Sequence, residues 1–507
     1  MLLNRSVQVL TAACLTLAGL SAALRPLAEP DEGRYGEAAR EMVATGDWVL
    51  PKQSGVTYPD KPVGGYWLMA GSMTVLGAVP LAVRLPALAA FAALLLLIFR
   101  QARRGPPGHA ETALLVAATC PLLLALGQLA TLDMILSTCV AAAILAGRKW
   151  TGSRNRRAGL LAGAALGAAF LVKGPVGPLL AISIQATTLV WEGRARLALR
   201  LLHPLHLLPM LAVGLPWYAL AAARDPDLVD FWLFRETLGR VASDVHGRGR
   251  PGYYFPALTV AALLPWLVGA AFARVRGRAP DAGDRHPDHR LHRVWALLPV
   301  VFFSIPAGKQ PAYLAPAMAG FALWLADWWR PGSAVAPGAA GRPFATAAGG
   351  IAALLLFAGG VAAVLFARDP EYARSDDRFA ATLQAENADA WPGAQLYGWS
   401  YGLTFRLQRT DLVACGPIPP AWRYARQTGA LRMPSTREER FAAALEVLDR
   451  GEPVFVLLHQ LEEDPENLVL FPAAARAAGI ELWLWLRSDD AALLANQPPA
   501  AGGAPLR

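Results

Sequence analysis

The sequence predicts an all-α polytopic membrane protein followed by a small C-terminal α/β domain. Of the 507 residues, 55% are hydrophobic and only 17% are charged. Apolar runs long enough to cross a bilayer recur along residues 1–368. Basic residues gather in alternate loops between these runs, and beyond residue 368 the composition becomes that of a soluble domain. These observations place the domain boundary between residues 1–368 and 369–507.

We expect about eleven membrane spans in the first domain. They lie near 7–25, 80–99, 110–127, 131–147, 158–172, 175–191, 203–222, 253–273, 294–306, 311–328 and 344–366. Several are short, and 158–191 could be one broken pair around Lys173. Residues 1–25 could instead be a cleaved signal peptide, because Arg5 precedes an apolar core that ends in small residues. The length of that run favours a first spanning helix.

The charge distribution predicts the orientation in the membrane. A net charge of +9 would suit a nucleic-acid partner, but the basic residues cluster near 100–104, 148–157, 194–200 and 274–293. Positive loops stay in the cytoplasm. We therefore expect a cytoplasmic N-terminus, external loops at 26–79, 223–252 and 306–311, an external C-terminal domain in which Cys415 is reachable, and no nucleic-acid partner.

The soluble domain shows strand and helix patterns without a catalytic motif. Strands are expected near 396–399, 412–415, 454–458 and 481–486, and helices at 437–450 and 465–478.

The first external loop, 26–79, carries most of the candidate chemistry. Asp31 follows a proline and could cap a helix. Apolar residues recur at helical spacing over 32–43, which predicts an amphipathic helix on the membrane surface, and 66–75 reads as a second. A chain this hydrophobic does not carry such a polar loop for packing alone. Its further polar residues are Arg34, Tyr35, Tyr58, Asp60 and Lys61.

Other polar residues lie at the outer ends of the expected spans. Asp133 is an acid at membrane depth and hence a functional candidate, although it could simply cap a helix. Lys173 precedes Gly-Pro and could bind a ligand or snorkel to the interface. Lys309 and Tyr313 are four residues apart and would share a face if helical.

The external loop 223–252 combines aromatic and basic residues, among them Arg240. This composition suits a lipid phosphate or an ordinary interface belt. His246 and Asp60 have no third ligand, so we expect no metal site.

These motifs resemble the dolichyl-phosphate-mannose protein mannosyltransferase superfamily, and most closely its bacterial lipid A aminoarabinose transferases. The family pattern D-E-x-R-Y-x-E-x-x-R-E-M, G-D-W and Y-x-E-K-P is matched over residues 31–62. The T-x-D at Asp133, the K-G-P at Lys173 and the run from Ser304 to Pro316 also match. Two departures are Asp60, where the closest branch has Glu, and Glu236-Thr237, where the family often has Glu-His.

The resemblance implies a GT-C glycosyltransferase in a bacterial inner membrane. It would move a sugar, with inversion and without metal or cofactor, from an undecaprenyl phosphate donor to a lipid A-type acceptor on the external face. Aminoarabinose is the sugar that the closest branch suggests. The external face supplies no nucleotide sugar, so a donor must arrive attached to lipid.

Acids suit proton transfer or orientation of the substrate, and cations suit the phosphate leaving group. The catalytic candidates are Asp31, Asp133 and Glu32. The donor-phosphate and substrate-binding candidates are Arg34, Tyr35, Tyr58, Asp60, Lys61, Lys173, Arg240, Lys309 and Tyr313.

Two alternatives stay open. The same fold could transfer mannose, glucosamine or galacturonate to protein or to an envelope glycan. A lipid-sugar transporter could also hold charged groups at membrane depth. The candidates come from separate segments that are all expected on one side, which favours an enzyme.

Overall fold

The computed structural model describes residues 5–239, 249–275, 286–306, 308–328, 376–396, 399–409, 411–415, 436–449, 452–461, 464–500 and 506. The chain divides into two compact units. The first comprises residues 1–23, 61–68 and 84–363, and the second comprises 24–60, 69–83 and 364–507. The expected span 344–366 lies outside the described residues.

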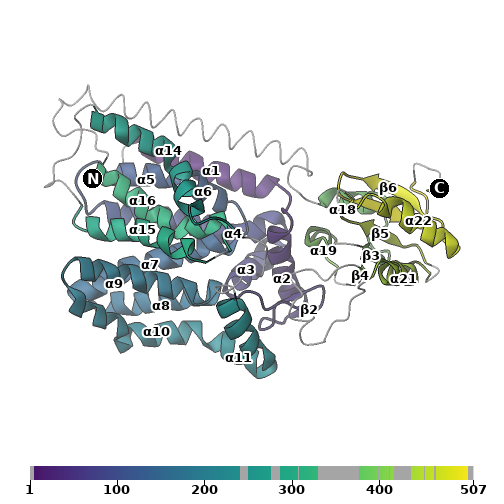
Figure 1. Cartoon of the computed structure of the whole chain (residues 1–507), viewed down its shortest axis with the longest axis horizontal. Coiled ribbons are helices and arrows are strands. Elements are labelled where there is room, and N and C mark those ends of the chain that lie inside the picture. The colour runs from purple at the N-terminus through teal and green to yellow at the C-terminus, as the bar shows by residue number, and fades with distance from the viewer. Residues whose placement is uncertain are drawn as a thin grey trace. The chain divides into compact units, whose positions relative to one another are not determined.

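The described part of the first unit is helical (Figure 1). Most expected spans have a helical counterpart. The longer elements are α1 (Arg5–Leu24), α4 (Pro80–Ala102), α5 (His109–Ala118), α6 (Pro121–Leu126), α7 (Leu132–Ser153), α8 (Arg156–Lys173), α9 (Val176–Trp191), α10 (Pro204–Gly214), α11 (Pro216–Arg224), α14 (Tyr254–Val275), α15 (His289–Ser304) and α16 (Ala315–Trp328). Short elements are η1 (Ala195–Leu202), α12 (Asp227–Asp230), η2 (Phe231–Gly239) and η4 (Pro311–Leu314).

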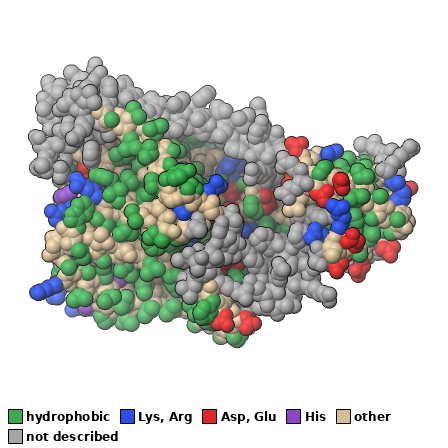
Figure 2. Space-filling model, in the orientation of Figure 1, with side chains coloured by type: hydrophobic (Ala, Val, Ile, Leu, Met, Phe, Trp, Pro, Cys, Tyr) green, Lys and Arg blue, Asp and Glu red, His purple; other side chains and the backbone are tan. Residues whose placement is uncertain are grey.

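Several of these helices have the character of membrane spans. Within the described residues, Val7–Leu24, Pro80–Ala102 and Pro204–Arg224 are long and apolar enough to cross a bilayer, and Val176–Trp191 and Tyr254–Val268 are shorter apolar helices. Figure 2 shows many hydrophobic side chains on the visible surface of this unit. Leu161 of α8 and Leu208 of α10 are 64% and 63% exposed. These helices therefore agree with the predicted class of polytopic membrane protein. The expected number of eleven membrane spans stays a prediction.

Proline and glycine shape the helix contacts of the first unit. Pro121 and Pro216 begin α6 and α11, because proline lacks the N–H that would continue the preceding helix. A Cβ on Gly163 of α8 would collide with the carbonyl oxygen of His206 in α10. Small residues at such crossings let membrane helices approach closely.

The second unit contains a five-stranded mixed sheet. Its strands β3 (Gly393–Leu396), β4 (Val413–Cys415), β5 (Phe455–Leu458), β6 (Trp483–Arg487) and β7 (Ala492–Ala495) lie in the order β4-β3-β5-β7-β6. β3 pairs parallel with β4 and β5, and β7 pairs antiparallel with β5 and β6. The strands expected near 412–415, 454–458 and 481–486 and both expected helices have counterparts among the described residues. The strand expected at 396–399 lies earlier in the chain, because β3 spans Gly393–Leu396, and β7, α18 (Asp377–Ala385) and α19 (Tyr401–Leu407) had no expected counterpart.

Side chains alternate between two cores, one on each face of this sheet. Val456 and Leu458 pack with α21 (Arg437–Leu448) and α22 (Asn467–Ala477). Phe455 and Leu457 pack with residues of α18 (Asp377–Ala385) and α19 (Tyr401–Leu407).

The same unit holds the start of the first loop, with α2 (Asp31–Thr45), the hairpin β1 (Lys52–Gln53) and β2 (Val56–Thr57), and the second half of α3 (Gly64–Leu76). α2 packs against α19. A Cβ on Gly33 would lie 3.0 Å from the Gly402 amide nitrogen, and one on Gly36 would lie 3.4 Å from the Phe405 ring. The approach at Gly33 is tighter than most Cβ contacts, whereas the 3.4 Å at Gly36 is an ordinary contact distance, so glycine at position 33 is what allows the two helices to come so close.

α2 differs from the one-sided surface helix expected for 32–43. Its polar residues Glu37, Arg40 and Glu41 are buried together with its apolar ones. Arg40 donates two hydrogen bonds to Glu37, at 2.7 and 2.8 Å, and the Glu41 carboxylate accepts from the Gly55 amide at 3.0 Å. The spacing of apolar residues predicted the helix correctly. It could not show that the polar face of the helix is also buried in the folded protein.

Glu29, just before α2, joins the loop to α19. Its carboxylate accepts a hydrogen bond from the Gly402 amide, and its second oxygen is buried without a hydrogen-bond partner among the described residues. Burial, with Asp376 nearby, raises the pKa of Glu29 to about 8.

We therefore expect Glu29 to make stability fall with rising pH. Its pKa in the folded state is about 8, above the ordinary value of 4.5, so the fold favours the protonated form. The contribution of Glu29 to the free energy of unfolding is complete below its ordinary pKa. It is lost as the pH rises through the pKa that Glu29 has in the folded state. Glu29→Gln should flatten the decline of the melting temperature between about pH 5 and about pH 9, measured by intrinsic fluorescence in detergent. Glu438→Gln, at an exposed position of the same unit, should keep the wild-type slope. Equal slopes in all three proteins would contradict this assignment.

Candidate functional site

Asp31 and Arg34 form an ion pair in the first turn of α2. The side chain of Arg34 is 14% exposed, whereas that of Asp31 is 44% exposed. Arg34 lies over the ring of Tyr35, with 5.7 Å between its Cζ atom and the ring centroid, and also interacts with Tyr58 and Tyr401. The N-cap position belongs to Pro30, so the expectation that Asp31 caps the helix is wrong. Asp31 is instead an accessible carboxylate held by a buried guanidinium.

Glu32 is oriented differently from its neighbour Asp31. It is 2% exposed, and its carboxylate accepts a hydrogen bond from the Ala28 amide at 3.0 Å. A buried acid that satisfies the backbone ahead of its helix is suited to holding the chain in place. Within the first loop, the geometry therefore favours Asp31 over Glu32 as the acid that meets a substrate.

Tyr58 and Asp60 belong to the same unit as this cluster. They are 1% and 9% exposed. Asp60 interacts electrostatically with Tyr401, which also interacts with Arg34 and Glu29. Sequence reasoning missed Tyr401 and Glu29. Glycine at 33 and 36 was the only local sign that another helix approaches.

In the first unit, the structure brings together Asp133, Lys173 and Tyr313. Asp133 lies in the first turn of α7, and Lys173 is the last residue of α8. The Lys173 Nζ atom is 2.5 Å from Asp133 Oδ1 and 4.9 Å from the centroid of the Tyr313 ring. Each charge matches the helix dipole at its position. Gly174 then turns the chain with a φ of 74°, a conformation that favours glycine.

The other described candidate cations of the first unit, Lys61 and Lys309, have partners elsewhere in the structure. Lys61 Nζ lies 3.4 Å from a carboxylate oxygen of Glu236, and both side chains are 13% exposed. Lys309 donates to the carbonyl oxygens of Pro306 and Arg250, at 2.6 and 3.0 Å. Arg240 lies outside the described residues.

Lys309 and Tyr313 do not share a helix face, contrary to expectation. Gln310 is extended, with φ −125° and ψ 142°, and the 3₁₀ turn η4 begins only at Pro311. Proline disfavours a helical conformation in the residue before it.

Comparison with known proteins identifies the family. The family model described as dolichyl-phosphate-mannose-protein mannosyltransferase matches residues 60–219. Two relatives carry the name undecaprenyl phosphate-alpha-4-amino-4-deoxy-L-arabinose arabinosyl transferase. That of Edwardsiella ictaluri is 34% identical over 357 residues, which cover 68% of this chain and 62% of the relative. That of Pseudomonas aeruginosa (strain LESB58) is 31% identical over 387 residues, which cover 74% and 68%. The chain thus spans less than two thirds of the length of several such relatives.

Solved structures agree on the fold. The crystal structure of ArnT from Cupriavidus metallidurans bound to undecaprenyl phosphate superimposes with a TM-score of 0.77 at 22% identity, over 98% of this chain and 99% of that one. This likeness confirms the predicted mostly helical fold. The identity to the Pseudomonas aeruginosa relative, 68% of which is covered, shows that the chain belongs to the family of undecaprenyl phosphate-alpha-4-amino-4-deoxy-L-arabinose arabinosyl transferases.

Proposed function

We propose that the protein moves a sugar from an undecaprenyl phosphate donor to a lipid A-type acceptor, with 4-amino-4-deoxy-L-arabinose as the sugar. The names of its relatives and the undecaprenyl phosphate bound to its structural neighbour support this assignment. The observation that carries it is the Asp31–Arg34 pair, which presents an accessible carboxylate from an otherwise buried motif. The test is mass spectrometry of lipid A from cells with and without the protein, which also distinguishes aminoarabinose from other sugars.

Asp31 is proposed to meet the acceptor. A guanidinium has five N–H donors in fixed directions, so Arg34 can orient the Asp31 carboxylate. The carboxylate could then accept the acceptor proton or orient the nucleophile. If the acceptor is a lipid A phosphate, which is already ionised near neutral pH, orientation is the main role.

The lysines are proposed to stabilise the phosphate of the donor as it leaves, together with Arg240. Lys61 and Lys173 each face an acid, and such a pairing fixes the position of a largely buried ammonium. A phosphate oxygen could share these ammonium groups with the acids. Asp133 then acts through Lys173, as the group that positions the ammonium.

We also propose the topology derived from the charge distribution. The N-terminus is cytoplasmic, the domain 1–368 crosses the inner membrane about eleven times, and the loop 26–79 and the domain 369–507 are periplasmic.

Cysteine labelling tests this orientation. Cys415 is buried, so the expectation that it reacts from outside is wrong. Ala44 and Ser153 are exposed and are better probe positions. A membrane-impermeant thiol reagent should label Ala44→Cys in spheroplasts and should label Ser153→Cys only after lysis. The reverse pattern would place the loop 26–79 in the cytoplasm and refute the topology.

Asp31→Asn should lower turnover by about 10²–10⁴-fold in protein that still folds and binds donor, although the melting temperature should fall because Arg34 loses its charged partner. The amide keeps the shape but loses the charge that pairs with Arg34. Turnover would be measured with saturating donor in proteoliposomes. Asp47→Asn is the matched control, because Asp47 lies in the same loop and accepts from the Val49 and Leu50 amides. A fully active Asp31→Asn enzyme would reject both proposed roles of Asp31.

Lys173 is best tested as a pair with Asp133. Lys173→Met alone leaves the buried Asp133 carboxylate without its cation, so a loss of activity could reflect a folding defect. The double variant Lys173→Met/Asp133→Asn removes both charges. It should melt near the wild-type temperature but bind undecaprenyl phosphate at least about tenfold more weakly, since one charge-assisted contact is lost.

Asp133→Asn alone should weaken binding less, because it keeps the ammonium. Lys149→Met, at an exposed position, is the control. Wild-type donor affinity in the double variant would exclude Lys173 from phosphate binding.

A further inference from the structure

A second polar cluster lies in the first unit, and the proposed reaction does not use it. It consists of His109 at the start of α5, His286 ahead of α15, His292 in α15 and Asp327 in α16. The three histidines are 0% exposed and Asp327 is 3% exposed. The imidazole centroids lie 4.5–6.1 Å apart. The sequence offered only His246 with Asp60 as a candidate metal site. The members of this cluster are far apart in the chain, so no local pattern indicates it.

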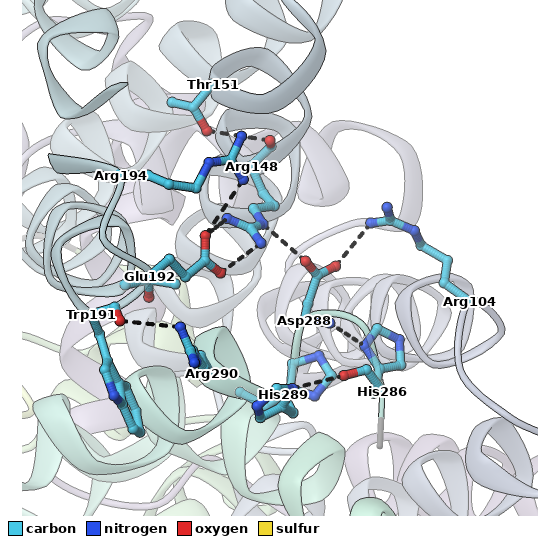
Figure 3. A network of polar contacts seen from close by, with 12 residues as sticks. Arg104, Arg148, Thr151, Trp191, Glu192, Arg194, His286, Asp288, His289 and Arg290 are labelled. Carbon is cyan, nitrogen blue, oxygen red and sulfur yellow. Dashed lines mark hydrogen bonds and ion pairs between the residues drawn. The ribbon is translucent and has the colours of Figure 1, made fainter. Parts of the chain in front are cut away.

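Both ring nitrogens of His286 have hydrogen-bond partners within the protein. Its Nδ1 accepts from the Asp288 amide at 2.9 Å, a contact drawn in Figure 3. Its Nε2 must therefore carry the proton, and it lies 3.0 Å from the Gln101 carbonyl oxygen, which accepts it. Both nitrogens are used, so His286 is an outer member of the cluster.

The Asp288 side chain is fixed as well. Its carboxylate accepts from Arg148 at 2.9 Å and from Arg104 at 3.1 Å (Figure 3). It also accepts from the Gln101 side chain at 2.9 Å. Asp288 is therefore part of an ion-pair network and has no need of a further ligand.

The other three side chains converge but leave His292 Nδ1 and Asp327 Oδ2 without a hydrogen bond in the described part of the chain. His109 Nε2 lies within hydrogen-bond distance of Asp327 Oδ1, at 3.1 Å, and the His286 amide donates to the same oxygen at 3.1 Å. His292 Nδ1 lies 3.9 Å from Asp327 Oδ2, which is too far for a hydrogen bond. Both of these atoms are buried and lack a hydrogen-bond partner among the described residues. Such atoms are costly and uncommon in native proteins, where an ion or a water molecule bound between them often satisfies them.

We propose that His109, His292 and Asp327 bind a divalent transition-metal ion, with Zn²⁺ the best match. One ligand atom from each lies within 4.8 Å of those of the other two. Bonds of about 2.1 Å to one tetrahedral ion put two ligand atoms about 3.4 Å apart. The 3.9 Å gap between His292 Nδ1 and Asp327 Oδ2 and the 3.1 Å between His109 Nε2 and Asp327 Oδ1 lie on either side of this value, so small side-chain movements suffice to bring in all three ligands. Imidazole nitrogens with one carboxylate are a ligand set that zinc takes.

The surroundings bear on the protonation of His292. An ion on Nδ1 leaves the proton on Nε2, where the side-chain nitrogen of Gln101 is 3.4 Å away. Because the three ligands come from α5, α15 and α16, the ion would tie three helices together. Its burial makes the role structural.

Metal analysis tests the proposal. The protein would be purified in detergent without chelators and with a histidine-free tag, incubated with Zn²⁺, desalted and analysed by inductively coupled plasma mass spectrometry. We expect about one zinc per chain in the wild type, with the content lost in His292→Gln and in Asp327→Asn. His206→Gln should retain it. His206 is an equally buried histidine in α10, outside the cluster.

Cobalt gives an answer that does not depend on how well the variants fold. Co²⁺ replacing zinc at a site of this kind should give the visible absorption bands of tetrahedral nitrogen and oxygen ligation in the wild-type protein. A strong chelator should abolish these bands and lower the melting temperature. The proposal is overturned if the wild type takes up neither ion stoichiometrically, or if His292→Gln and Asp327→Asn retain as much metal as His206→Gln.

Discussion

The need to pair every buried charge shapes both units of this protein. Taking an ion out of water costs several kcal/mol, and only a close partner of opposite charge or well-placed dipoles offset that cost. In α2, Arg34 has Asp31 and Arg40 has Glu37. In the first unit, Lys173 has Asp133, while Arg148 bridges Glu192 and Asp288. The candidate residues for catalysis are thus held by the same interactions that allow them to be buried.

Pairing of this kind also suits a substrate that carries charge. A largely buried ammonium that is held by an acid has few rotamers left to lose. A phosphate that reaches Lys61 or Lys173 would find the charge already oriented, so less reorganisation is needed at the moment of reaction. Asp31 differs from the buried acids Glu32 and Glu37 of the same helix because its side chain is 44% exposed, which fits the substrate-facing role proposed for it.

The C-terminal part of the chain has a clear structural relation to the first loop. α2 packs on α19 through Gly33 and Gly36, and Glu29 accepts a hydrogen bond from the Gly402 amide. Arg40 also reaches the carbonyl oxygen of Arg409 at 3.4 Å. The sequence beyond residue 368 carries no recognisable catalytic motif, yet it supplies the surface against which the motif of α2 is ordered.

Local patterns in the sequence determined the helices, most of the strands, the mostly helical membrane class and the family. Apolar runs, proline breaks and a motif within residues 31–62 are properties of neighbouring residues, so they can be read without a structure. Only the tertiary structure determined which distant residues form hydrogen bonds and ion pairs with one another. Asp133 and Lys173 are separated by 40 positions, Glu29 and Gly402 by 373, and His109 and Asp327 by 218. Such contacts depend on how helices pack in three dimensions, and so does the burial of a polar helix face, which is why α2 was mistaken for a helix with one solvated side.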